Sequence, residues 1–133
     1  MSRARKAIAY LALFHAGMGL SILIGPHSLG VPDHAILYDL MPWGVRAGLW
    51  IGLGILAALA SLRSVRWGWV LLSVMPAQRL VGHAWSALAY LVPGVPDGLP
   101  SAFADVIVWG AVLLLIRHLA GWPDLTEKRA PRE

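Results

Sequence analysis

Four long apolar segments dominate this sequence and leave few folds open to it. They run from about residue 4 to 25, 44 to 62, 67 to 92 and 102 to 122. The hydrocarbon core of a bilayer takes roughly 20 apolar residues in an α-helix, and each segment is of that order. Hydrophobic residues form 58% of the 133-residue chain and charged residues only 14%, whereas soluble domains carry about 25% charge. We therefore predict an all-α integral membrane protein, a four-helix transmembrane bundle.

The segments between the apolar runs carry helix-breaking residues. Residues 26–42 are rich in Gly, Pro, His and Asp, and residues 93–100 contain three prolines and two glycines, so we expect loops there. Residues 63–66 are too few for more than a tight turn, so the second and third segments should pack antiparallel. Residues 123–133 are polar, and we expect a disordered tail.

Basic residues predict the orientation of the bundle, because Lys and Arg concentrate in short cytoplasmic loops. With four spans, nine of the eleven Lys and Arg residues fall on one side: Arg3, Arg5, Lys6, Arg63, Arg66, Arg117, Lys128, Arg129 and Arg132. The other side has Arg46 and the acids Asp33, Asp39, Asp97 and Asp105. We expect a multi-pass protein of the bacterial inner membrane with both termini in the cytoplasm. The first apolar run is longer than a secretory signal, so we expect it to be retained.

The second segment carries a row of small residues. Gly44, Gly48 and Gly52 are four residues apart, which places them along one helix face where another backbone can approach closely. This spacing fits a self-association face of an oligomer. It fits also, and more commonly, the contact between two helices of one bundle, because such spacing is frequent in membrane helices generally.

The third segment is the most polar of the four. Pro76 should kink its helix, because proline removes one hydrogen bond of the helical ladder. Arg79 lies near mid-membrane, where a charge costs roughly 2.5–3.5 kcal/mol on insertion scales. Arg79, His83, Ser86 and Tyr90 share one helix face by their spacing. We predict that this face lines the bundle interior or a subunit interface.

Depth in the membrane suggests partners for these groups. Asp105 should lie about one turn below the outer surface, with His83 deeper and Arg79 deeper again. His15, in the first segment, is expected at a level similar to that of His83. We predict a polar column of these four residues: His15, Arg79, His83 and Asp105. Such a column could conduct protons or ions, form a seam between subunits, or be a buried pair that fixes helix register.

Other functional residues are sparse. The chain has no cysteine and no sequence motif of a hydrolase, metalloprotease or phosphate-binding loop, so we predict no enzyme, no catalytic residues and no cofactor. Loop residues His27, His34, Asp33 and Asp39 lack the spacing of a metal site, and we predict no metal. Trp50, Trp85 and Trp109 lie about two turns below the outer boundary, where they could stack around the column or face lipid. The basic residues flank apolar runs, so we expect the bilayer as partner and not nucleic acid.

The second half of the chain carries a resemblance. The order Met75-Pro76-Ala77-Gln78-Arg79, then Trp85, then the Pro93–Pro100 loop, then Ala120-Gly121-Trp122-Pro123 resembles small four-span membrane proteins of actinobacterial phages. Members of that group sit among lysis genes and are described as holin-like. The Gly-rich first and second segments are also similar to those of DoxX-like four-helix membrane proteins.

The phage resemblance implies a holin-like role. Such proteins accumulate in the inner membrane, associate laterally and then permeabilise it, which releases or activates a cell-wall lytic enzyme. The alternatives are an accessory subunit that binds a larger membrane complex, and a DoxX-like small transporter or redox-associated protein that uses the polar column.

Overall fold

Four helices make up the regular structure of the described chain. The computed structural model describes residues 2–25, 41–95, 98 and 100–121. Its helices are α1 (Arg3–Ile24), α3 (Trp43–Arg63), α4 (Val65–Leu91) and α5 (Ala102–Ala120). Each overlaps one predicted segment, which confirms the all-α fold. The predicted 123–133 tail and most of the 26–42 loop lie outside the described residues.

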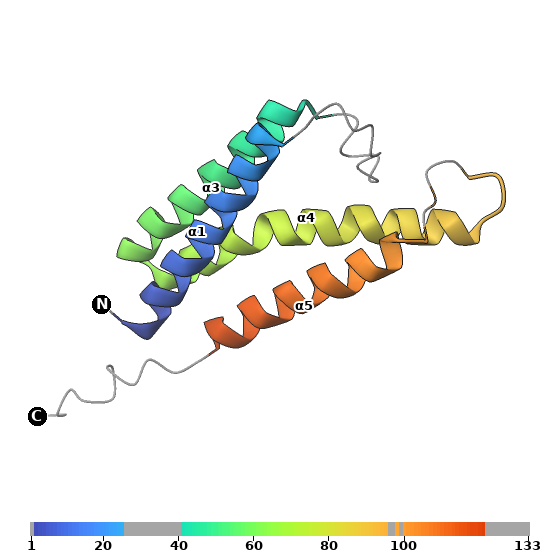
Figure 1. Ribbon diagram of the computed structural model, residues 1–133. Helices are drawn as coiled ribbons and strands as arrows, with labels where there is room; N and C mark the ends of the chain where they lie inside the picture. Colours follow the sequence, from blue (N-terminus) through green and yellow to red (C-terminus); the bar gives the residue numbers. More distant parts are fainter. Residues whose placement is uncertain (1, 26–40, 96–97, 99, 122–133) are drawn as a thin grey trace, which may run out of the picture.

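The helices form two antiparallel pairs, α1 with α3 and α4 with α5, and α4 connects the two pairs. Helix α1 packs along α3, and α5 packs along α4, while α4 also contacts α3 and α1. Ser64 alone separates α3 from α4, so these two helices turn sharply into each other. Figure 1 shows the two pairs meeting near this turn and diverging toward their other ends. The half of α4 that lies away from the α3–α4 turn is therefore accompanied mainly by α5.

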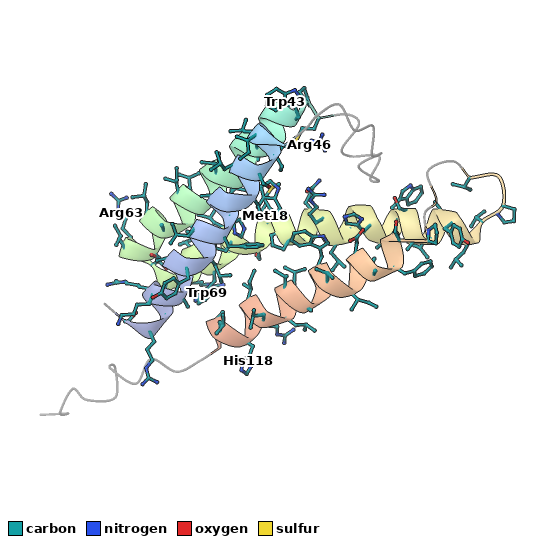
Figure 2. The ribbon with its side chains drawn as sticks, in the orientation of Figure 1. Met18, Trp43, Arg46, Arg63, Trp69 and His118 are labelled. Atoms are coloured by element: carbon teal, nitrogen blue, oxygen red, sulfur yellow. The ribbon has the colours of Figure 1, made fainter. Side chains whose placement is uncertain are left out.

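A hydrophobic cluster closes the end of the bundle near the α3–α4 turn. Its buried members come from all four helices: Ile8, Ala57, Trp69, Leu72 and Ile116. Figure 2 shows Trp69 on α4 within this region and Arg63 beyond it at the end of α3. One end of each helix is thus held in a common core.

Arg5 adds a polar contact at the same end. Its guanidinium donates to the carbonyl oxygens of Ser61 at 3.1 Å and Leu62 at 3.3 Å. These carbonyls belong to the last turn of α3, where helical carbonyls lack donors and a cation is favoured. Arg5 thereby caps α3 and fixes the start of α1 beside it.

Three glycines allow the close approach of helices within the chain. A Cβ at Gly19 would lie 2.7 Å from the carbonyl oxygen of Ala47, and one at Gly54 would lie 2.9 Å from that of Ala12. A Cβ at Gly68 would lie 3.0 Å from the Cβ of Ser61. These glycines set the distances between α1 and α3 and between α3 and α4.

The helices have the length and apolarity of membrane spans, with one exception. Helices α1, α3 and α5 are long and apolar enough to cross a membrane by length and composition. Helix α4 is the longest at 27 residues, but its polar residues set it apart from the other three. Large hydrophobic side chains, among them Leu13, Leu59 and Ile107, are exposed on the outer surface. Lipid is the solvent that suits such a surface, because soluble proteins seldom expose contiguous apolar patches.

Gly19→Ala should destabilise the protein, whereas Gly17→Ala should not. The methyl group at position 19 meets backbone of α3, which cannot move aside as a side chain can, so we expect a loss of about 1–3 kcal/mol. Gly17 lies two residues away on the same helix with no heavy atom within 4 Å of its added Cβ. Thermal unfolding in detergent, followed by circular dichroism, measures both. Equal melting temperatures for the two variants would contradict the close contact.

Candidate functional site

The polar groups of the bundle interior begin at a proline. Pro76 is fully buried, and α4 continues through it from Val65 to Leu91. Proline has no N–H, so the carbonyl of Leu72, four residues earlier, loses its helical donor. His15 of α1 replaces this donor: its Nε2 lies 3.1 Å from the Leu72 oxygen. A neighbouring helix therefore satisfies the carbonyl that Pro76 leaves open, as a backbone group buried away from water requires.

The surroundings of His15 identify the tautomer that this contact needs. The ring is fully buried, and its Nδ1 lies 2.9 Å from the carbonyl oxygen of Leu11. The Leu11 carbonyl can accept the helical N–H of residue 15, whereas the Leu72 carbonyl has no helical donor. A neutral imidazole has a single N–H. The contact with Leu72 requires that proton on Nε2, and the neutral ring then turns an acceptor, Nδ1, toward the Leu11 oxygen; only a ring protonated on both nitrogens donates to both carbonyls.

Aromatic rings connect His15 to Arg79. The His15 ring lies 4.9 Å from the Trp50 ring, centroid to centroid, and Trp50 lies 5.9 Å from Trp109. The Arg79 guanidinium carbon is 5.8 Å from the Trp109 centroid, within the range of a cation–π contact. Arg79 is 8% exposed, so the face of Trp109 offsets part of the cost of burying this cation. The contacts between His15 and Arg79 thus run through indole rings.

His83 and Asp105 meet in the half of the α4–α5 interface that lies nearer the connection between these two helices. Nδ1 of His83 lies 3.4 Å from Oδ2 of Asp105. The His83 side chain is 6% exposed and that of Asp105 is 43% exposed, so the contact has one buried and one accessible partner. If His83 is protonated, this contact is an ion pair that links α5 to the most polar part of α4.

The structure divides the predicted polar column into two parts. His83 and Asp105 are in contact, and Arg79 lies one turn below His83 on α4. His15 bonds to Leu72, about three turns before His83 on α4, and so lies well below the level expected for it. The reason is that α1 crosses α4 near the α3–α4 turn and does not run beside the half of α4 that lies away from this turn (Figure 1).

The tryptophans also separate into two groups. Trp50 and Trp109 belong to a second buried cluster with Met75, and Met18 packs against it (Figure 2). Trp85 of α4 is 53% exposed and belongs to neither buried cluster. Of the two arrangements open from the sequence, Trp50 and Trp109 are buried in contact, with their ring planes tilted at 43°, whereas Trp85 is exposed.

The glycine row on α3 takes no part in contacts within the described chain. A Cβ at Gly44, Gly48 or Gly52 would meet no heavy atom within 4 Å. The buried residues of α3 are Ala47, Trp50, Gly54, Ala57 and Ser61. At 3.6 residues per turn, the row runs from the side of the helix at Gly44 to the face opposite these buried residues at Gly52. The row is therefore an open face among the described residues, and the glycines at close contacts between helices are Gly19, Gly54 and Gly68.

A metal centre is not evident where the chain is described. Within residues 2–25, 41–95 and 100–121, no three His, Cys, Asp or Glu side chains come together in a way that could hold a metal ion. The loop residues His27, His34, Asp33 and Asp39 lie outside the described residues. The site that the structure does describe is a buried row of polar and aromatic groups along α4.

His15→Leu should be costly only while Pro76 is present. The substitution leaves the buried Leu72 carbonyl without a donor, which costs about 1–3 kcal/mol. In a Pro76→Ala background, residue 76 regains its N–H and donates to Leu72, so the same substitution should cost less. A double-mutant cycle measured by thermal or detergent unfolding gives the coupling, which we expect at about 0.5–3 kcal/mol.

The control for this cycle is a residue beside the bond but outside it. Val74→Ala changes an exposed side chain of α4, and its effect should add to that of His15→Leu. Equal costs of His15→Leu with and without Pro76 would show that His15 does not replace the missing donor.

Comparison of the chain with protein-family models, with curated protein sequences and with solved structures finds no match. Any functional assignment therefore depends on the residues and their geometry. Two features of that geometry bear on function, the polar row along α4 and the open glycine face of α3.

Proposed function

We propose that this protein is a four-span inner-membrane protein that self-associates through the glycine face of α3 and permeabilises the membrane in the manner of a phage holin. The observation that carries the proposal is the open space above Gly44, Gly48 and Gly52. In lipid, helices associate through close backbone contact at small residues. A glycine row with no partner among the described residues of its own chain is suited to the same row of a second copy.

The surroundings of the glycine face support a helix–helix contact. Val45 and Leu49 are exposed beside the row, and they can pack around a partner helix that approaches the glycines. Arg46, at the start of α3, is the one charged residue of this helix away from its last turn (Figure 2). Most of the face is thus apolar and small, the composition that favours association within lipid and not in water.

The position of α4 supports a fourth span. Eleven of its residues are buried, against four in α1, five in α3 and three in α5. Polar residues inside a membrane face the protein interior, and Arg79, His83 and Ser86 are all buried. Its low apolarity is therefore compatible with a span shielded by its neighbours. With four spans, the basic residues place both termini in the cytoplasm.

Self-association gives a route to permeabilisation. A face that pairs with its own copy makes a contact related by a twofold axis, and a second contact surface elsewhere on the molecule extends pairs into larger assemblies. Large assemblies of small membrane proteins can exclude lipid and open lesions. A purely accessory subunit would use the same glycine face for a different membrane protein, without an effect on the membrane by itself.

Expression of the protein in a bacterium should collapse the membrane potential after a delay, and Gly48→Leu should prevent or postpone the collapse. The leucine side chain fills the space that a partner backbone would occupy, while the fold of the single chain is unaffected because position 48 is open. A voltage-sensitive dye and culture density follow the event, and membrane fractionation checks equal insertion.

Gly110→Leu is the matched control. Gly110 lies on α5 and, like Gly48, has no heavy atom within 4 Å of its added Cβ. This variant should behave as the wild type. Undisturbed growth and potential at high membrane levels of the wild-type protein would reject permeabilisation and leave the accessory role as the better explanation.

Single-cysteine labelling tests the topology, because the natural chain has no cysteine. In spheroplasts, a membrane-impermeant maleimide should label Ser101→Cys, before α5, without permeabilisation. Ser2→Cys and Ser64→Cys should react only after permeabilisation, since they lie at the opposite end of the bundle. Labelling of Ser64→Cys and Ser101→Cys from the same side would mean that α4 does not cross the membrane.

A further inference from the structure

The charges of the described chain are gathered at one end. The described residues include eight Lys and Arg residues and one acidic residue, Asp105. Six of the eight are at the ends of helices next to the shared core near the α3–α4 turn: Arg3, Arg5, Lys6, Arg63, Arg66 and Arg117. Asp105 lies in the first turn of α5, at the other end of that helix. Within the described residues, this basic end has no carboxylate to balance it.

Arg117 has a different setting from the other cations. Together with Leu114, His118 and Gly121 it lines an open groove of about 580 Å³ at the end of α5. Figure 2 shows His118 directed outward from this end of the helix. The groove has two levels: two basic side chains near the helix end, and the exposed Leu114 one turn deeper in the apolar part.

These two levels match the two parts of a phospholipid. A phosphate group is recognised by cationic side chains, and arginine binds it through paired N–H donors. An acyl chain needs apolar surface directly below the phosphate, and Leu114 and Leu115 supply it, being 68% and 51% exposed. Soluble phosphate would use the cations but would gain nothing from the leucines.

We propose that the groove lined by Leu114, Arg117, His118 and Gly121 binds an anionic phospholipid of the surrounding leaflet. The phosphate lies against Arg117 and His118, and an acyl chain runs along Leu114. The remaining basic residues of this end attract anionic headgroups less specifically, as juxtamembrane cations do. This inference requires that α5 be embedded in a bilayer but is independent of self-association and of permeabilisation.

Native mass spectrometry of the full chain in mild detergent tests the site. The protein is titrated with phosphatidylglycerol or with phosphatidylcholine of the same acyl chains, and the bound fraction is measured. We expect preferential binding of phosphatidylglycerol. Arg117→Gln should weaken this binding about fivefold, which corresponds to roughly 1 kcal/mol for one cation near the lipid surface.

Three further variants define the site. Arg117→Lys keeps the charge and should retain most of the binding, whereas Leu114→Gln removes the apolar contact and should weaken it. Arg63→Gln removes an exposed cation at the same end but outside the groove and should have a smaller effect than Arg117→Gln. Circular dichroism and thermal melting confirm that each variant keeps its helices.

Three results would overturn the proposal. Equal binding of both lipids would exclude recognition of the anionic headgroup. An equal loss for Arg63→Gln and Arg117→Gln would assign binding to diffuse charge and not to the groove. Displacement of phosphatidylglycerol by millimolar inorganic phosphate, together with no effect of Leu114→Gln, would identify a site for soluble phosphate. None of these results depends on whether the protein permeabilises membranes.

Discussion

The hydrogen bond from His15 to the Leu72 carbonyl is the contact on which the arrangement of the helices depends. Pro76 opens the ladder of α4 in the bundle interior, where water cannot serve as a replacement donor. His15 closes it from α1 at 3.1 Å and thereby fixes both the rotation and the height of α1 against α4. The His15 ring then supports Trp50, and Trp50 contacts Trp109 of α5. One missing backbone donor thus organises side chains from all four helices.

A second constraint is the division of polar and apolar groups among the helices. Helix α4 holds Arg79, His83 and Ser86 in its buried face, where α5 runs beside it, and α1 and α3 contact α4 nearer the α3–α4 turn. These three helices can then expose large apolar side chains on their outer surfaces. The glycines are divided in the same way: Gly19, Gly54 and Gly68 allow contacts inside the chain, whereas Gly44, Gly48 and Gly52 leave a face of α3 open. Interior and exterior are thereby separate, and a partner can bind the exterior without rearranging the core.

The helices were predictable from the sequence, but the partners of the buried groups were not. Apolar run length identifies each helix, and the spacing of Arg79, His83 and Ser86 predicts their common buried face. Tyr90, expected on the same face, is instead 52% exposed. The predicted column placed Asp105 next above His83, and these two side chains are in contact, with Nδ1 3.4 Å from Oδ2. The role of His15 was not predicted, because depth along a straight bundle ignores the angle at which α1 crosses α4. The useful signal was the offset of four residues between Pro76 and the carbonyl that it leaves open, but sequence alone does not tell which helix supplies the donor.

Glycine spacing shows a related limit. Regular spacing by four singles out Gly44, Gly48 and Gly52, yet the glycines at close contacts between helices have no such spacing and come from three different helices. Contacts within one chain can use a single glycine wherever two helices cross, whereas a twofold contact between copies brings the same helix face together along its length. A regular row left open is therefore more informative about association than about the fold. Because that row lies on α3 and the basic groove lies on α5, the proposed self-association and lipid binding use separate surfaces, and one copy can take part in both at once.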